Sequence, residues 1–423
     1  MESRTDNAQQ PATKSNPVAT STQATSTQAT STQATSTQAT STQAPGATIG
    51  MVGGGQLGRM FAVAAAAMGY RVVIFTDAEN SPASHVAAQT IVGDLNDPDA
   101  IDRFAEQCDV ITLEFENIPA STIARCRQFA PTYPSASVLA TAQNRLIEKT
   151  TFREAGLPVT PFQRVHDVKS MIAAGDELGW PLIIKTARSG YDGKGQHRID
   201  SSEAADQVDW ASTDEWIAEK CIAFDKEVSV IVARTPDGRC ETFPIFENTH
   251  RNHILDISVA PAELSDALSV EARRIAVAAA EAIDVIGLLC VEFFVSGDQV
   301  MINEVAPRPH NSGHLTIEGC ETSQFEQHVR AVCNLPLGST EQRTQFATMA
   351  NLLGDLWTAE GEAPNWLQAL ADSGVSLHLY GKAEARPGRK MGHLTMTGGN
   401  RDELVKRVSE ARTKLQGSSE PSR

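Results

Sequence analysis

The stretch LLCVEFFVSGDQVMINEVAPRPHNSGH, residues 288–314, decides the fold. Two apolar runs, 287–295 and 300–306, flank Gly297-Asp298, so the sequence predicts two antiparallel strands joined by a tight hairpin turn. Each strand carries one glutamate among apolar residues, Glu292 and Glu304. The hairpin can place these carboxylates side by side, where like charges need a cation. Oxygen ligands that act together with phosphates indicate Mg²⁺, and two separately salt-bridged glutamates are the structural alternative.

Upstream lies a second group of features typical of a nucleotide site. Lys185 ends the apolar strand predicted for residues 180–187, and the glycine-rich loop GYDGKGQ follows at 190–196. Backbone N–H groups of such a loop approach phosphate oxygens, while lysines supply point charges. The loop lacks the GKS or GKT ending of a Walker loop. Further strands are predicted at 215–222 and 226–235, where Glu219 precedes Glu227 by eight residues. The backbone of 220–222 can read adenine and Glu227 can accept from ribose hydroxyls, although solvated strand ends would look the same.

The N-terminal part predicts a parallel sheet with helices on both faces. Strands are expected at 47–52, 71–76 and 109–115, and an alanine-rich helix at 56–68. A glycine cluster at 50–58 precedes that helix, a context that suits a phosphate on a helix N-terminus. Taken alone, this cluster favours a nicotinamide-dependent oxidoreductase, with glycines needed only for a tight turn as the alternative. The second group of features, which no dehydrogenase needs, argues against the oxidoreductase.

Several motifs together resemble one family. GGGQLGRM, LEFENIP, GYDGKGQ, APRPHNSGH and RPGRKMGH are similar to the N5-carboxyaminoimidazole ribonucleotide synthetases, the ATPase subunits of phosphoribosylaminoimidazole carboxylase, within the ATP-grasp superfamily. The resemblance covers about Pro45 to Arg412. It implies an α/β chain, which we divide into a disordered STQAT-repeat tail (1–44), a Rossmann-like pre-ATP-grasp domain (45–140), an ATP-grasp α+β domain (141–338), a small C-terminal domain (339–412) and a flexible tail (413–423).

The resemblance also implies a set of site residues. Glu292 and Glu304 would hold Mg²⁺. Asp192 is the candidate proton acceptor, and Lys194 would lie near the bicarbonate or carboxyphosphate oxygens. The residues expected to bind ATP are Arg145, Lys185, Gly190, Tyr191, Asp192, Gly193, Lys194, Gly195, Glu219, Lys220, Cys221, Ile222, Glu227, Asn303 and Glu304.

The acceptor nucleotide is expected on the other side of the site. Gln56 and Leu57 would meet it, Glu114 or Glu116 would face its ribose hydroxyls, and Asn311 would complete that side. A basic segment around Pro387-Gly388 would hold the 5′-phosphate through Lys382, Arg389 and Lys390, and an ordinary solvated basic loop is the alternative. The roles of His250 and His393 stay open.

The implied reaction joins bicarbonate to 5-aminoimidazole ribonucleotide. ATP would convert bicarbonate to carboxyphosphate, and the products would be the N5-carbamate, ADP and phosphate, in purine biosynthesis. The nearest alternative is a formate-dependent glycinamide ribonucleotide transformylase, although GYDGKGQ and RPGRKMGH favour the carboxylase. An NAD-dependent oxidoreductase and a non-catalytic nucleotide-binding protein are the alternatives from other classes.

Composition restricts the partners. With 36 basic and 52 acidic residues the formal charge is −16, which disfavours nucleic acid, and no apolar run reaches transmembrane length. The seven cysteines form no CxxC pair, as expected for reduced thiols in the cytoplasm. The partners expected are small molecules. The family resemblance suggests a homodimer, and we expect a separate mutase to take the product.

Overall fold

The computed structural model describes residues 41–188, 195–210, 213, 215–357 and 362–415. Most of the predicted tail and most of the GYDGKGQ loop therefore lie outside the described residues. At the start of the described chain, the Gln43 backbone N–H donates to the Cys333 carbonyl (2.9 Å), and the Gln43 carbonyl accepts from the Tyr70 hydroxyl (2.7 Å). Across the described ranges, no helix has both the length and the apolar character that a membrane crossing requires.

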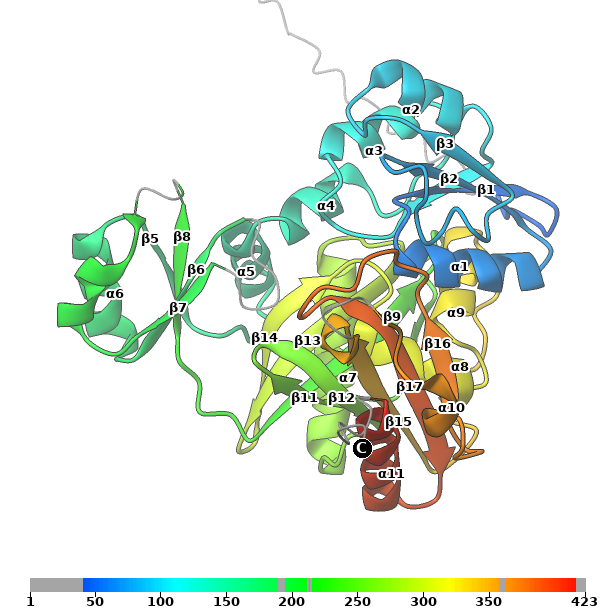
Figure 1. The fold of residues 1–423 in the computed structure, drawn as a ribbon. Helices are drawn as coiled ribbons and strands as arrows, with labels where there is room; N and C mark the ends of the chain where they lie inside the picture. Colours follow the sequence, from blue (N-terminus) through cyan, green and yellow to red (C-terminus); the bar gives the residue numbers. More distant parts are fainter. Residues whose placement is uncertain (1–40, 189–194, 211–212, 214, 358–361, 416–423) are drawn as a thin grey trace, which may run out of the picture. The chain divides into compact units, whose positions relative to one another are not determined.

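The N-terminal region contains the predicted parallel sheet, in the order β3-β2-β1-β4 (Figure 1). Alternate residues of β2 enter different cores: Val72 and Ile74 pack with helix α1, and Val73 and Phe75 pack with α2 and α3. Because alternate side chains of a strand point to opposite faces, the helices cover both faces of the sheet, as the sequence predicts. The elements are β1 (Thr48–Val52), α1 (Gln56–Ala67), β2 (Arg71–Thr76), β3 (Gln89–Val92), α2 (Pro98–Ala105), β4 (Val110–Leu113) and α3 (Ala120–Cys126).

Two helices lead from this sheet into an antiparallel sheet ordered β5-β8-β6-β7. Helix α6 covers that sheet, where Met171 and Ala174 join Leu182, Ile184 and Trp216 in one core. The elements are α4 (Ala136–Ala142), α5 (Arg145–Glu154), β5 (Phe162–Val165), α6 (Val168–Leu178), β6 (Leu182–Thr186), β7 (Gln196–Ile199), η1 (Ser202–Gln207) and β8 (Trp216–Lys220).

The largest sheet runs in the order β14-β13-β9-β11-β12-β15-β17-β16, with β10 paired to β9. The predicted hairpin is its first pair, β13 and β14, and it turns at Gly297, whose φ is +56°. The strands are β9 (Lys226–Arg234), β10 (Cys240–Thr242), β11 (Phe246–Arg251), β12 (Ile254–Ala260), β13 (Gly287–Ser296), β14 (Gln299–Ala306), β15 (Phe346–Leu353), β16 (Ser376–Leu379) and β17 (Lys390–Gly398).

This sheet continues across the boundary that we predict between residues 338 and 339. Strand β12 pairs with β15, with Ile257 opposite Ala350, so the strands assigned to the C-terminal domain extend the ATP-grasp sheet. Helix α7 packs on β9, β13 and β14, and α11 packs on β15 and β17. The remaining helical elements are α7 (Asp266–Ala282), η3 (Asn311–Leu315), α8 (Thr316–Gly319), α9 (Gln324–Val332), η4 (Gly354–Leu356), α10 (Trp366–Ala369) and α11 (Arg401–Lys414).

Candidate functional site

A cleft of about 640 Å³ gathers most of the residues that the sequence assigns to the nucleotide and the metal. It is lined by parts of β6, β8, β9, β11, β13 and β14, together with Arg145 from α5. Asn311 and Lys390, which the sequence assigns to the acceptor side, line the same cleft. The predicted ATP and metal residues among its lining are Arg145, Lys185, Glu219, Lys220, Cys221, Ile222, Glu227, Glu292, Asn303 and Glu304.

The two carboxylates on the hairpin lie side by side. Glu292 and Glu304 are direct cross-strand partners, which places their side chains on one face of the sheet. Glu292 is 18% exposed and Glu304 41% exposed, and the Glu304 Oε2 lies 3.8 Å from the Arg145 Nη2. Burial opposes the ionisation of Glu292, but His310, together with His250 and Arg308, outweighs burial and lowers the pKa of Glu292 to about 2. The pair is therefore a concentrated negative charge that faces the cleft.

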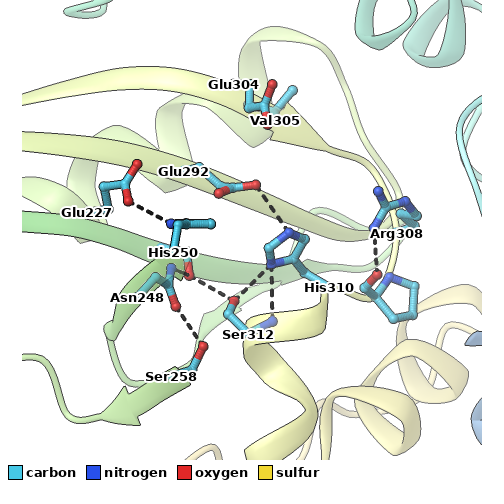
Figure 2. Close-up of polar contacts among 12 residues, drawn as sticks. Glu227, Asn248, His250, Ser258, Glu292, Glu304, Val305, Arg308, His310 and Ser312 are labelled. Atoms are coloured by element: carbon cyan, nitrogen blue, oxygen red, sulfur yellow. Dashed lines mark hydrogen bonds and ion pairs between the residues drawn. The ribbon is translucent and has the colours of Figure 1, made fainter. Parts of the chain in front are cut away.

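A chain of hydrogen bonds supports Glu292 from behind (Figure 2). The His310 Nε2 lies 3.1 Å from the Glu292 Oε1, and the Ser312 backbone N–H donates to the His310 Nδ1 at 3.3 Å. Because a backbone N–H can only donate, we assign the ring proton to Nε2, where it points at Glu292. The Ser312 Oγ continues the chain to the Ser229 Oγ at 2.8 Å. This chain holds one oxygen of Glu292 in place.

Glu292, Glu304 and the neighbouring Asn303 are the residues that could hold a metal ion in the cleft. Within the described ranges, no group of three or more His, Cys, Asp and Glu side chains is placed to hold a metal ion. Mg²⁺ is commonly bound by one or two carboxylates and completed by water and substrate phosphates. Beside Glu292 and Glu304, the Asn303 Oδ1 is buried and has no hydrogen-bond partner in the described chain. A donor set made only of oxygens, and left incomplete, fits Mg²⁺ bound together with a nucleotide.

One face of helix α5 carries three ionisable side chains, of which Arg145 lines the cleft and the other two are buried beside it. The Asn144 side chain caps the helix by accepting from the Leu146 and Ile147 N–H groups, so helical spacing starts at Arg145. Arg145, Glu148 and Lys149 then follow at i, i+3 and i+4, which share a face. Burial and the nearby Glu304 raise the pKa of Glu148 to about 8. Glu148 and Lys149 were not predicted from the sequence, although NRLIEK contains both the capping residue and this spacing.

A buried carboxylate joins two lysines at one wall of the cleft. The Glu219 Oε2 accepts from the Lys185 Nζ at 3.0 Å, and the Glu219 Oε1 lies 3.4 Å from the Lys149 Nζ. Burial favours the neutral acid, yet the two lysines outweigh it and hold the pKa of Glu219 below its usual value. The side chain of Glu219 is thus engaged with the chain's own lysines, although residues 219–222 line the cleft as the sequence predicts.

Another part of the cleft combines aromatic rings with a histidine–glutamate pair. Phe224 and Phe294 stack with ring centroids 4.6 Å apart and an interplanar angle of 8°. The Glu227 Oε2 lies 2.6 Å from the His250 Nδ1. Burial lowers the pKa of His250, but the hydrogen bond and charge of Glu227 outweigh burial, so this pKa is raised. The structure therefore places His250, whose role the sequence left open, beside the predicted ribose ligand Glu227.

The first glycine cluster holds a carboxylate of the chain itself. The buried Glu114 accepts from the Gly55 N–H and, at 2.7 Å, from the Gly58 N–H at the start of α1. A Cβ on Gly53 would lie 2.4 Å from the Glu114 Cγ, so glycine there makes room for this side chain. Burial raises the pKa of Glu114, while the two N–H groups oppose the rise. The anion position that suggested a dinucleotide is thus occupied by Glu114.

The other residues predicted to bind the acceptor nucleotide are Leu57, Glu116 and Asn311, and each lies in a different environment. Leu57 is 8% exposed and belongs to the core beside α1, so its backbone is the part that can meet a ligand. Glu116 is bound by Arg308, whose Nη2 donates to the Glu116 Oε1 at 3.1 Å. Asn311 is half-buried, and its side-chain amide atoms are buried with no hydrogen-bond partner among the described residues. Both predicted ribose ligands are therefore bound by groups of the chain, Glu114 by two backbone N–H groups and Glu116 by Arg308.

The basic segment is organised by its own backbone. The Lys382 Nζ donates to the Lys390 carbonyl at 2.7 Å, and the Arg389 Nη1 donates to the Glu384 carbonyl at 2.7 Å. Lys390 lines the cleft, and Lys382 acts electrostatically on Glu114. Of the predicted phosphate ligands, Lys390 therefore lies at the cleft and Lys382 lies near the glutamate of the glycine cluster, while the contact of Arg389 is within the segment itself.

His393 is fully buried, its Nδ1 lies 3.0 Å from the Tyr380 hydroxyl, and its ring stacks on His378, so its contacts are internal. The loop residues Gly190, Tyr191, Asp192, Gly193 and Lys194 lie outside the described residues. Gly195 is described, and its carbonyl accepts from the Thr186 N–H at 3.0 Å.

Family models match the chain in three consecutive segments. The ribonucleotide synthetase preATP-grasp domain matches residues 46–143, the ATP-grasp domain matches 150–325, and the phosphoribosylaminoimidazole carboxylase C-terminal domain matches 347–407. The N5-carboxyaminoimidazole ribonucleotide synthase of Bacillus subtilis is 42% identical over 369 residues, covering 86% of this chain and 95% of that protein. A bifunctional purine synthesis protein of Dictyostelium discoideum is 41% identical, but the match spans only 37% of it.

Solved structures are similar over the same region. The ADP complex of an N5-carboxyaminoimidazole ribonucleotide synthetase is 41% identical with a TM-score of 0.81, covering 88% of this chain and 98% of that one. An N5-carboxyaminoimidazole synthase from Aspergillus clavatus, solved with ADP and 5-aminoimidazole ribonucleotide, is 32% identical with a TM-score of 0.79. That match covers 87% of this chain and 98% of the other.

Proposed function

Because this chain belongs to the N5-carboxyaminoimidazole ribonucleotide synthase family, we propose that its cleft catalyses the ATP-dependent carboxylation of 5-aminoimidazole ribonucleotide in purine biosynthesis. The observation that carries the proposal is the pairing of Glu292 with Glu304 in the same cleft as Lys185. A carboxylate pair and a lysine that share one cleft suit a nucleotide triphosphate and its metal ion.

We assign the nucleotide to the cleft in the following way. The backbone of 220–222 and the stacked rings of Phe224 and Phe294 supply a polar edge and an apolar face, the two features that adenine needs. Glu227, held by His250, would accept from the ribose hydroxyls. Lys185 and Arg145 would then face the phosphates, where fixed positive charge stabilises the charge that develops during phosphoryl transfer.

Glu292 and Glu304, with Asn303 beside them, would hold Mg²⁺. Bound there, Mg²⁺ would neutralise charge on the phosphate oxygens and orient the terminal phosphate for transfer. His310 would keep one Glu292 oxygen engaged and so leave the other to the metal.

The acceptor nucleotide would bind between the glycine cluster and the basic segment. Gln56 and the backbone of Leu57 would meet it, Glu114 would accept from its ribose hydroxyls, and Asn311 would supply its unpaired amide. A carboxylate that already accepts two backbone hydrogen bonds keeps further lone pairs for a hydroxyl. Lys382, Arg389 and Lys390 would hold the 5′-phosphate.

The chemistry we propose proceeds through carboxyphosphate. Bicarbonate is a poor electrophile because its negative charge repels nucleophiles and hydroxide is a poor leaving group. Transfer of the γ-phosphoryl group of ATP would give carboxyphosphate, and attack by the amine would release phosphate. Asp192 would accept the amine proton and Lys194 would hold carboxyphosphate oxygens. The loop that carries both residues would close to exclude water.

We also propose the setting in which this reaction runs. Each of the seven cysteines is a free thiol, as suits a reducing cytoplasm. The family resemblance favours a homodimer and a separate mutase that consumes the product. We propose that residues 45–140, 141–338 and 339–412 are the three domains of the chain.

The test measures ADP release with each pair of substrates. We expect release with ATP, bicarbonate and 5-aminoimidazole ribonucleotide, and only background release with formate and glycinamide ribonucleotide. E292Q and E304Q should abolish release, whereas E321Q, which alters an exposed glutamate outside the cleft lining, should retain it. Release with formate, or thermal protection by NADH without a need for Mg²⁺, would instead support one of the rival classes.

A further inference from the structure

Lys149 is a buried lysine whose ammonium group joins three parts of the fold. Its side chain is 1% exposed, and its Nζ donates to the Asn303 carbonyl at 2.8 Å and to the Thr160 hydroxyl. The Glu219 Oε1 lies 3.4 Å away. Asn303 is on β14 and Glu219 on β8, while Lys149 itself is on α5. Burial and the charge of Lys185 lower the pKa of Lys149, and the Glu219 carboxylate opposes that shift. Because the carbonyl and the carboxylate can only accept, the contacts of the Nζ suit the donating ammonium form.

The charges in this cluster do not cancel. Glu219 carries the single negative charge between Lys149 and Lys185, so the three side chains together carry one net positive charge. Lys149 is sealed in the interior, whereas Lys185 is 12% exposed and lines the cleft. The excess positive charge therefore reaches the cleft through Lys185. Without Lys149, Glu219 and Lys185 would form a closed neutral pair, and the phosphates would have to compete with Glu219 for the lysine.

We propose that Lys149 is a positioning residue for the phosphates of ATP: it takes a share of the charge of Glu219 and so keeps Lys185 available to them. This inference rests on the proposed function, in which Lys185 faces the phosphates. Lys149 does not line the cleft, so it acts through Lys185 and not by touching the nucleotide.

The same contacts set the spacing of the two walls of the cleft. Lys149 holds the carbonyl of Asn303, which precedes the proposed metal ligand Glu304, and it holds Glu219, which binds Lys185. One ammonium group therefore links the strand that bears the metal ligand to the residue that orients the phosphate-binding lysine. Such a link preorganises the site before the nucleotide arrives.

The experiment compares ligands with and without phosphates on the full-length protein. In K149M we expect ADP to bind about 10- to 100-fold more weakly, as for the loss of an interaction with a charged group, while adenosine affinity stays unchanged. K149R should retain most of the ADP affinity because it keeps the charge. As a control, R273M removes a half-buried arginine that bonds the Thr242 hydroxyl and the Phe243 carbonyl away from the cleft. It should lower the melting temperature without changing ADP affinity.

A double variant separates the effect of charge from that of packing. In K149M/E219Q the carboxylate that would capture Lys185 is gone, so we expect ADP affinity to rise at least about tenfold above that of K149M. Equal ADP affinity in K149M and the wild type would overturn the inference, as would parallel losses for ADP and adenosine. If K149M does not fold, the test relies on K149M/E219Q alone. The inference is then refuted if K149M/E219Q binds ADP more than about tenfold more weakly than the wild type does. Failure of the wild type to bind ADP would count against the proposed function itself.

Discussion

Replacement of His328 by glutamine should remove a defined part of the acid sensitivity of this fold. His328 lies on α9 with 1% of its surface exposed, and its Nε2 is 3.0 Å from the hydroxyl of Thr112 on β4. Its Nδ1 is buried and has no hydrogen-bond partner in the described chain. A second ring proton would therefore have no acceptor, and burial lowers the pKa of His328 from 6.5 to about 3. Glutamine keeps a group that can bond Thr112 but does not titrate.

The sign and size of the effect follow from linkage. The pKa of His328 is depressed on folding, so between 6.5 and about 3 the unfolded chain binds the extra proton and the folded chain does not. Stability is therefore fully present above about pH 6.5 and falls as the pH drops through this window. At about pH 5 the loss from this one group is about 2 kcal/mol. A folded pKa of about 4 would change that figure little, because it too lies well below 5.

The assay is urea denaturation of the wild type and H328Q at about pH 7.5 and about pH 5. Other buried histidines, including His314 and His393, have lowered pKa values and add to the acid sensitivity of both proteins. The difference between the two pH-dependent losses isolates His328, and we expect the wild type to lose about 2 kcal/mol more than the variant. Equal losses would show that His328 is protonated in the fold, contrary to its burial.

Three further variants test other parts of the site. G53A should lower the free energy of unfolding by about 1–3 kcal/mol more than G46A, because both have positive φ but only at Gly53 would a Cβ meet Glu114; equal effects would mean that the carboxylate can move aside. K382M should raise the KM for 5-aminoimidazole ribonucleotide about 10- to 100-fold without changing the KM for ATP, and an unchanged KM for 5-aminoimidazole ribonucleotide would remove Lys382 from the phosphate site. D192N should lower turnover about 10²–10⁴-fold while ADP still binds, and unchanged turnover would exclude Asp192 as the base.

Strands and turns that are marked by a few neighbouring residues, such as an apolar run or a glycine, could be predicted from the sequence. Strand β2 has the predicted bounds because the centre of RVVIFT, Val72 to Phe75, is apolar and buried, and the hairpin followed from two apolar runs around Gly297-Asp298. Strand β11 (Phe246–Arg251) was not predicted, since FENTHR is mostly polar and pairs mainly through its backbone with β9 and β12. A strand of this kind is stabilised by its partners and leaves little trace in its own composition.

Contacts between charged residues that are distant in the chain were harder to predict from the sequence. The sequence placed Glu292 and Glu304 together because one turn separates their strands, but it contained no sign that His310 would bond Glu292. Lys149 and Glu219 are far apart in the chain, and their contact exists only because α5 and β8 pack together. A charged residue in a sequence gives no indication of whether it will be buried and paired or left in solvent.

By itself, the sequence determined the strands with long apolar runs, the hairpin that pairs two carboxylates, the glycine-rich turns and the family, because each depends on residues close in the chain or on motifs read in order. Only the tertiary structure decided that the N–H groups of Gly55 and Gly58 bind Glu114, that Glu219 contacts two lysines, and that β12 and β15 pair across a predicted domain boundary. Those outcomes depend on which distant groups meet in a space closed to water, where an unpaired charge is costly and the partner is supplied by packing.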